Sequence, residues 1–165
     1  MGVIVDISDF KGRNFIATNS YNQNGLDELI DSVEIDVLSR LFGSDMATDF
    51  ISDINNGAPQ NPLYLDIFNP LSVQVGRNVL VSEGIKKMIT YFVYAEFNVD
   101  SSSRSTNEGR KVMSGENSES LKTASLKRYN EGILTARAIQ AYIRKNSTDY
   151  PLYKGVYFQT VNPIW

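Results

Sequence analysis

The chain has 165 residues, of which 42% are hydrophobic and 21% charged, so it carries enough apolar material for one globular domain and too much for a disordered chain. It contains no histidine and no cysteine, which excludes disulfides, thiolate metal sites and the commonest general base of enzymes. The formal charge of −3 gives no overall basic field for binding nucleic acid. We therefore expect a protein that is not an enzyme and that uses no cofactor or metal.

Residues 1–23 are predicted to form an extended N-terminal arm. Val3, Val5 and Ile7 alternate with Asp6 and Ser8, as in a short strand. The start of the chain lacks the basic and apolar regions of a signal peptide, and no apolar run approaches the ~20 residues of a membrane span.

A helical domain is predicted over residues 24–146. Apolar residues recur at three- and four-residue steps over 26–42, as on one face of a helix, and acidic residues such as Glu34 fall mostly on the solvent side. Ser44 is suited to cap a second helix over 44–54. The carboxylates of this second helix repeat at four-residue steps: Asp45, Asp49 and Asp53. They could hold a hard cation, but a solvated face is the simpler interpretation.

The middle of the chain contains patterns of both strands and helices. Residues 63–68 fit either a strand or a helical turn, and 71–75 alternate as a weak strand. Residues 79–98 are predicted to form a helix that is apolar nearly all round, which indicates burial on several sides. Within it, Glu96 is the best candidate for a shifted pKa, as a satisfied polar contact in a bundle, an interface residue or a catalytic group.

Residues 99–117 are polar and rich in serine, and we expect them to form a mobile loop. The loop holds the densest basic cluster of the chain: Arg104, Arg110 and Lys111. These cations could face phosphate or DNA, or they could serve only to solubilise the loop. The last predicted helix covers 118–144, where apolar residues keep helical spacing.

Residues 147–165 form a C-terminal tail that is rich in aromatic residues and interrupted by proline and glycine. Aromatic side chains offer large contact area at low entropic cost, so this tail is predicted to bind a neighbouring subunit or another protein. The candidate partner-binding residues are Tyr150, Leu152, Tyr153, Tyr157, Phe158, Ile164 and Trp165. The alternative is that the tail folds back onto its own core.

The order of these elements resembles a known family. The resemblance rests on SDFK at 8–11, LSRLFG at 38–43, EGIKKMITYFVYA at 83–95, STNEG at 105–109, and a helix from YNEG at 129–132 to AIQAYI at 138–143. Together these stretches resemble the head–tail connector (adaptor) proteins of tailed bacteriophages, in particular the type found in phages of Bacteroidetes. The similarity spans most of residues 8–144.

This resemblance implies a mainly α-helical bundle of about four helices, with an extended arm and an extended tail. About twelve copies would form a ring in the neck of the virion, between the portal protein and tail or neck ring proteins. DNA would pass through its channel without being read, and Arg104, Arg110 and Lys111 are the candidates to face it. Before assembly the protein would lie in the host cytoplasm. Two alternatives are a tail-completion or other neck ring protein, and a small cytoplasmic protein-binding module.

Overall fold

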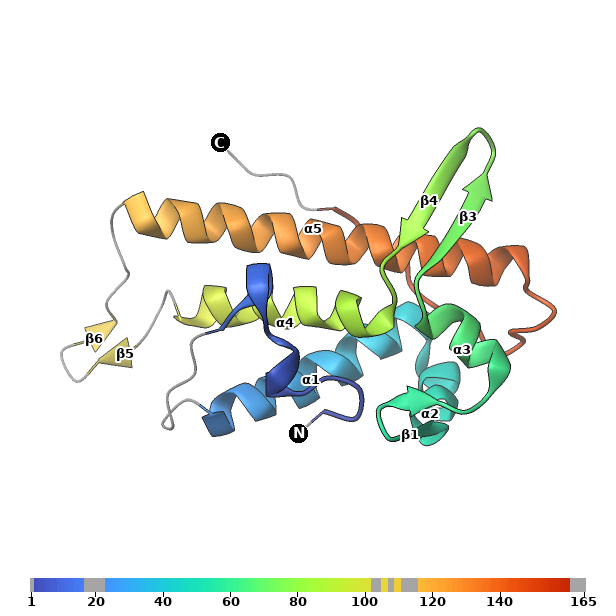
Figure 1. Ribbon diagram of the computed structural model, residues 1–165, viewed down its shortest axis with the longest axis horizontal. Coiled ribbons are helices and arrows are strands. Elements are labelled where there is room, and N and C mark those ends of the chain that lie inside the picture. The colour runs from blue at the N-terminus through green and yellow to red at the C-terminus, as the bar shows by residue number, and fades with distance from the viewer. Residues whose placement is uncertain (1, 17–22, 102–104, 107–108, 111–115, 161–165) are drawn as a thin grey trace.

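The computed structural model describes residues 2–16, 23–101, 105–106, 109–110 and 116–160. Within this part of the chain, five α-helices and three two-stranded antiparallel sheets are present (Figure 1), and the expected mainly α-helical class is confirmed. The helices are α1 (Gln23–Phe42), α2 (Ser44–Ser52), α3 (Pro62–Phe68), α4 (Ile85–Ser101) and α5 (Glu116–Lys145). The strand pairs are β1 (Ile54–Asn55) with β2 (Ala58–Pro59), β3 (Leu71–Val75) with β4 (Asn78–Ser82), and β5 (Ser105–Thr106) with β6 (Gly109–Arg110).

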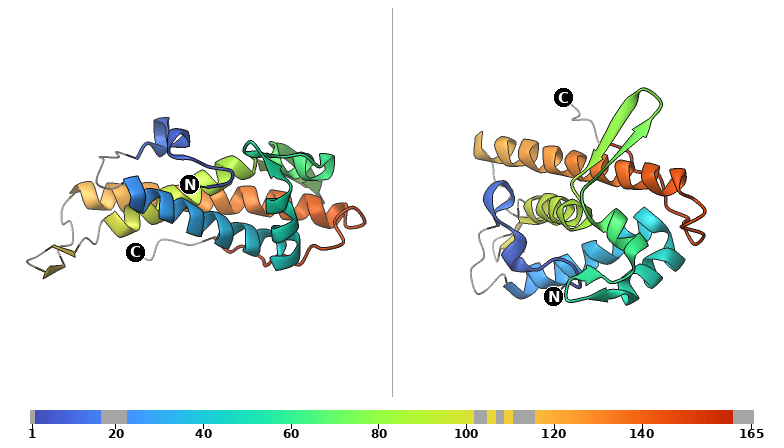
Figure 2. Two further views of the ribbon diagram at one scale, coloured as in Figure 1. Left: turned by 90° about the horizontal axis from the view of Figure 1, so that it is seen from below. Right: turned by 45° about the vertical axis from the view of Figure 1, so that its right-hand side comes forward.

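Three long helices form the body of the molecule. The helices α4 and α5 lie side by side and antiparallel, α1 packs along α4, and α2 and α3 gather at the end of the body where α1 stops (Figures 1 and 2). Fully buried side chains from all three long helices meet between them, among them Ile30, Leu41, Ile89, Phe92 and Ile139. Their helical spacing is the apolar periodicity seen in the sequence, so the bundle forms where the pattern predicts it.

The first two helices are close to their predicted positions. The helix expected over 26–42 is confirmed and begins at Gln23, and the helix expected over 44–54 ends at Ser52. Gly43 separates them with a φ of +84°, a backbone conformation that side chains other than glycine rarely adopt. The ambiguous segment 63–68 is helical, and the Asn61 side chain accepts a hydrogen bond from the Leu63 amide at its start.

The prediction of one helix over 79–98 is wrong in its first third. Residues 78–82 are instead β4, which pairs with β3 in a register that places Val73 opposite Leu80. Gly76 has a φ of +60° and supplies the first central position of a two-residue turn, as in a type II′ hairpin. Gly84, with a φ of +91°, then separates β4 from α4. The strand expected over 71–75 is confirmed.

The N-terminal arm is not the strand that its alternation predicts. It forms two short 3₁₀ helices, η1 (Ile7–Asp9) and η2 (Gly12–Asn14). Asp6 starts the first with a capping box, because its carboxylate accepts from the Ser8 amide while the Asp9 carboxylate accepts from the Asp6 amide. These local hydrogen bonds compete with strand pairing and win here, since the described residues offer the arm no partner strand.

The segment predicted as a loop over 99–117 is partly regular. Helix α4 continues to Ser101, a small hairpin joins β5 and β6, and α5 begins at Glu116, two residues before the predicted start at 118. Residues 102–104, 107–108 and 111–115 lie outside the described part of the chain.

Candidate interaction surfaces

The first part of the C-terminal tail is packed on the body of its own chain. Tyr150 and Phe158 are 4% and 1% exposed, and the ring of Phe158 lies 6.0 Å from that of Phe92 in α4. The Arg40 guanidinium of α1 stands 4.8 Å from the Phe158 ring centroid, as in a cation–π contact. For these two aromatic residues the structure therefore has the fold-back that the sequence left open.

Backbone groups of the tail complete the C-terminal end of α1. The Lys154 amide donates to the Phe42 carbonyl and the Val156 amide to the Arg40 carbonyl, both at 2.8 Å. A helix leaves its last carbonyls without helical partners, so the tail supplies donors that α1 lacks. No sequence motif indicated this contact.

Gln140 links its own helix, α5, to both α1 and the tail. Its buried Nε2 group donates to the Leu41 carbonyl at 3.2 Å and to the Val156 carbonyl at 2.8 Å. Gly155 lies so close to α1 that a Cβ at this position would overlap the Leu41 carbonyl oxygen. A close approach of two backbones therefore fixes glycine here.

The other predicted partner-binding residues of the tail are less buried. Leu152 and Tyr157 are 42% and 56% exposed, whereas Tyr153 is half-buried. The Arg137 guanidinium of α5 covers the Tyr157 ring at 4.8 Å, so this exposed aromatic is still oriented by the body. Ile164 and Trp165 lie outside the described residues.

Among the residues whose burial is described, Glu34 is the buried acid, and its predicted solvent position is wrong. Its side chain is 3% exposed because the N-terminal arm crosses it. The carboxylate accepts hydrogen bonds from the successive amides of Val3, Ile4 and Val5 at 3.0 to 3.3 Å. A Cβ at Gly2 would lie 2.5 Å from Glu34 Oε2, so the arm also passes close to this group. The periodicity of α1 alone gives no sign of a covering segment.

The surroundings of Glu34 shift the pKa of its carboxyl in two opposite directions. Burial raises the pKa of the carboxyl, and the three backbone amides lower it by stabilising the charged form. The nearby Asp31 carboxylate adds to the rise. Burial is the strongest of these effects, and the pKa of Glu34 lies above its ordinary value.

The three carboxylates considered as a cation site have separate partners. Asp45 pairs with Lys154 at 2.9 Å, and Asp49 accepts a hydrogen bond from the Tyr64 hydroxyl. Asp53 accepts from two successive amides, those of Gln60 and Asn61, which closes the β1–β2 loop. Across the described part of the chain, acidic residues do not gather in threes as a metal site would need.

A groove opens between α4 and the first half of α5. The small residues Ala95 and Ser125 form its base, and Val99, Leu126 and Tyr129 form its apolar walls. Its volume is about 450 Å³. Two charged residues, Glu96 and Lys122, complete the lining.

Glu96 lies on the exposed surface of α4, so its expected place inside the bundle is wrong. The basic cluster is outside what the structure describes: Arg104 and Lys111 are not placed, and for Arg110 only the backbone in β6 is described. These three residues stay predictions.

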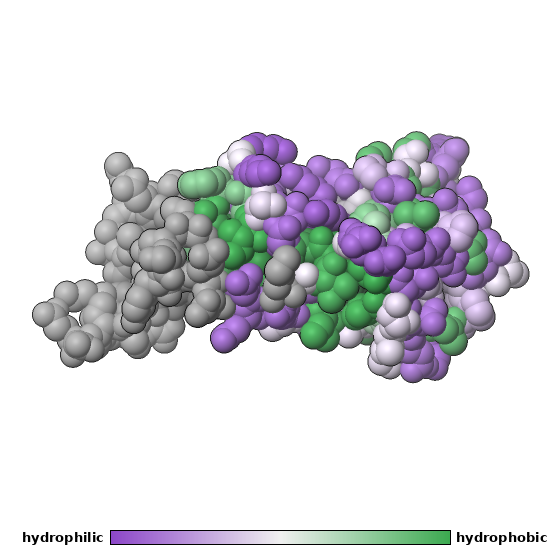
Figure 3. All heavy atoms as spheres, turned by 60° about the horizontal axis from the view of Figure 1, so that its bottom comes forward, coloured by the Kyte–Doolittle hydropathy of each residue, from purple (hydrophilic) through white to green (hydrophobic). Residues whose placement is uncertain are grey.

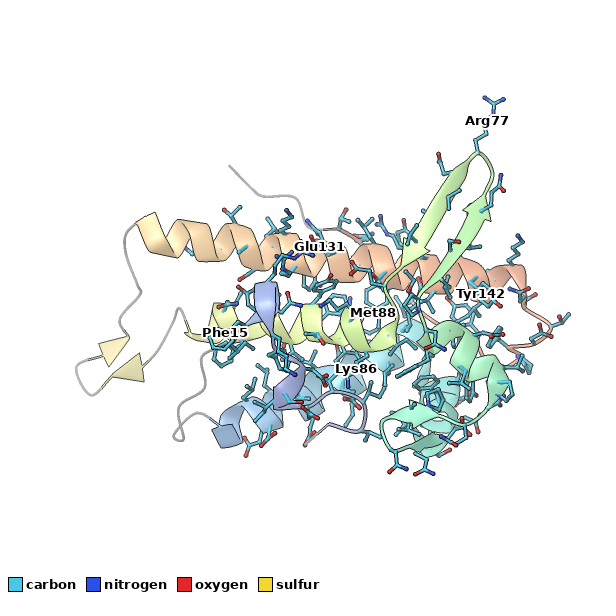
Figure 4. The ribbon with its side chains drawn as sticks, viewed as in Figure 1. Phe15, Arg77, Lys86, Met88, Glu131 and Tyr142 are labelled. Carbon is cyan, nitrogen blue, oxygen red and sulfur yellow. The ribbon has the colours of Figure 1, made fainter. Side chains whose placement is uncertain are left out.

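The hairpin of β3 and β4 projects beyond α5 (Figure 1). Val73 and Ser82 are buried near its base, whereas Val79 and Val81 are 61% and 62% exposed. Arg77 stands at the tip and points away from the body (Figure 4). The sequence signal for this hairpin is Gly76, which precedes Arg77 and Asn78 in the turn.

On the face of the molecule that carries α1, apolar and polar surface are separated. Apolar surface gathers near its middle, and polar surface dominates the end that holds α2 and α3 (Figure 3). Ile35 of α1 is 59% exposed, and Phe15 of the arm is 65% exposed. None of the helices in the described part of the chain is long and apolar enough to cross a membrane.

Comparison with known proteins identifies a family that covers most of the chain. The model of a family of unknown function, DUF6712, matches residues 38–158. This range runs from the second half of α1 to Phe158 and so includes the hairpin, the groove and the folded part of the tail. No curated protein and no solved structure matches the chain.

Proposed function

The chain belongs to the DUF6712 family, and we propose that it is a structural head–tail connector of a tailed-phage virion. In this role it forms a ring under the portal protein and links the portal to tail or neck ring proteins. The order of sequence elements over residues 8–144, which resembles such adaptors, is one support for this proposal.

The structural observation that carries the proposal is a helical body with apolar side chains exposed at separate places on its surface. Val81 on the hairpin, Val99 at the groove and Tyr157 on the tail are 62%, 60% and 56% exposed. Single exposed apolar residues are ordinary on protein surfaces, but a projecting apolar hairpin and an apolar groove are typical of surfaces that become covered.

The arrangement of these surfaces suits a ring. A closed ring is built from heterologous contacts, in which one surface of a subunit meets a different surface of the next. The hairpin crosses the second half of α5 (Figure 1), whereas the groove lies beside the first half, so one subunit can use both at once. An isologous dimer would require one self-complementary surface instead.

The test combines the purified chain with the portal protein of the same phage. We expect a ring of about twelve copies to add to the portal, visible by negative-stain microscopy and by mass. Quantitative mass spectrometry of purified virions should find a similar number of copies per particle.

Other outcomes would redirect the proposal. A chain that ignores the portal but is present elsewhere in the virion would be a tail-completion or other neck ring protein. A chain absent from virions would contradict a structural role and leave the small cytoplasmic protein-binding module.

A further inference from the structure

The β3–β4 hairpin, residues 71–82, is a finger with one attached face and one open face. Val73 and Leu80 are paired across the strands on the attached face, where Val73 is 4% exposed and Leu80 is half-buried near α5. Alternation then puts Val79 and Val81 on the other face, and both are more than half exposed. The open face of the finger therefore carries two exposed valines opposite the uncharged polar residues Ser72 and Gln74.

The backbone of the finger is also incomplete as a sheet. Its two strands pair only with each other among the described residues, so both outer edges keep unpaired amides and carbonyls. Exposed strand edges invite pairing with another chain. These properties indicate a finger that is covered in the working state of the protein.

The groove between α4 and α5 has dimensions that suit the open face of the finger. Its volume of about 450 Å³ lies in the range of roughly 300–1,000 Å³ that is usual for binding clefts. Valines two residues apart on a strand are separated by about 6.8 Å. Ala95 and Val99, four residues apart on α4, are separated by about 6 Å along the groove. Two neighbouring valines can therefore pack against successive helical turns.

The charged residues indicate in which direction the finger would lie along the groove. Arg77 at the tip is the only charged residue in 71–82. The ring contact between Phe92 and Tyr129, at 5.2 Å, fixes the register of α4 against α5 and puts Glu96 nearer that pair than Lys122 is. A finger that lies with its tip toward Tyr129 brings Arg77 to the side of Glu96 and away from Lys122.

The finger crosses the second half of α5 with its tip pointing away from the body (Figures 1 and 4), whereas the groove lies beside the first half of α5, so a chain does not insert its own finger into its own groove. We propose that the finger of one copy docks in the α4–α5 groove of a second copy, with Arg77 beside Glu96 and Val79 beside Val99. The contact is heterologous, so it leaves a free finger and a free groove for further copies. It rests on the proposed function in that it supplies the subunit contact of the ring.

The absence of native cysteine makes a direct test possible. Val79→Cys and Val99→Cys are introduced into two separately tagged full-length chains, which are mixed at high concentration and oxidised mildly. A disulfide forms only when the two Cα atoms come within about 7 Å. We expect the mixed V79C–V99C dimer on a non-reducing gel.

Ile35→Cys is the matched control, because Ile35 is as exposed as the two valines but lies on α1. We expect several-fold more V79C–V99C dimer than V79C–I35C dimer. Equal yields would mean random collision and would overturn the proposal. A predominance of V79C–V79C dimer would also overturn it, since the finger would then pair with another finger.

The charge contact has its own test in the same assay. Arg77→Glu in the V79C chain and Glu96→Arg in the V99C chain should each lower the yield of the V79C–V99C dimer. The two changes together should restore it. Unchanged yields in both single variants would contradict the proposed orientation. Circular dichroism of each variant checks that the helical body is intact.

The outcome is independent of the portal experiment. Cross-linking without a ring on the portal would contradict the connector function and keep the contact between copies. A ring on the portal whose subunits fail to cross-link through V79C and V99C would keep the function and overturn this contact.

Discussion

The arm and the tail both lie along the helical body, but they are attached in different ways. At the start of the arm, three successive amides converge on the single carboxylate of Glu34, although Ile4 and Val5 also bury their side chains. The tail instead divides its contacts among α1, α4 and α5, through Phe158, Gln140 and backbone hydrogen bonds. Polar contacts are therefore concentrated on one carboxylate at the start of the arm, with the Asp9–Lys86 ion pair at 3.0 Å further along it, and are distributed in the tail.

The arm and the tail should therefore respond differently to substitution. A distributed attachment should fail only where a large buried side chain is removed. A concentrated attachment should fail locally when its one acceptor is removed, while the rest of the protein stays folded.

Phe158→Ala is expected to have the largest effect. The side chain is 1% exposed and packs on Phe92, so its removal leaves a cavity in the core. We expect the free energy of unfolding to fall by about 3–5 kcal/mol, as for other buried phenylalanines. Urea denaturation followed by circular dichroism measures this, and Tyr157→Ala, at a 56% exposed neighbour, should cost much less. Equal losses in the two variants would contradict the distinction.

Glu34→Ala should release the start of the arm. It leaves the amides of Val3, Ile4 and Val5 without their acceptor, and we expect a loss of about 1–3 kcal/mol. Hydrogen exchange should become faster at these three amides and stay unchanged in α5. Glu34→Gln keeps one acceptor oxygen and should lose less. Unchanged protection of the three amides in Glu34→Ala would show that the carboxylate does not hold the arm.

The pH dependence of stability sharpens the role of Glu34. Because its pKa is raised in the folded protein above the ordinary value of 4.5, the folded chain binds this proton more tightly than the unfolded chain does. The resulting stabilisation is fully present below pH 4.5 and is lost as the pH rises through the raised pKa. The stability difference between the wild type and Glu34→Gln should therefore fall over this window. A difference that grows with pH would mean that the amides, and not burial, dominate.

Lys154→Ala should have the smallest effect, although Lys154 lies in the tail. Its ion pair with Asp45 is exposed, at 72% and 55% for the two side chains, and such pairs contribute little to stability. The hydrogen bond and charge of Lys154 lower the pKa of Asp45. NMR titration of the variant should find this pKa higher than in the wild type, with the unfolding midpoint unchanged. An unchanged pKa of Asp45 would contradict the pairing.

The sequence predicts the helices well and the boundary between β4 and α4 poorly. The stripe of α1 is regular, and both of its ends were found to within a few residues. Val81, Ile85 and Met88 keep helical spacing, so the apolar pattern runs across the end of a strand into a helix without a break. Gly84 marked that boundary, but a single glycine is a weak signal beside a continuous periodicity.

Side chains covered by distant segments were the least predictable. Glu34 is polar and off the apolar stripe of α1, so local pattern assigns it to solvent, and only the path of the arm buries it. Gln140 likewise owes its burial to a tail that lies against both α1 and α5. The aromatic content of the tail indicated contact, but composition cannot say whether Phe158 finds its partners in its own chain or in another.

The contact between the tail and α1 also has a consequence for biosynthesis. The carbonyls of Arg40, Leu41 and Phe42 receive their hydrogen bonds from residues 154 and 156 and from Gln140. A ribosome that has made α1 must therefore translate more than a hundred further residues, from Gly43 to Val156, before that helix end is complete. Chains released before residue 154 would carry a helix end with unsatisfied carbonyls, which should expose them to proteolysis while the full-length product is protected.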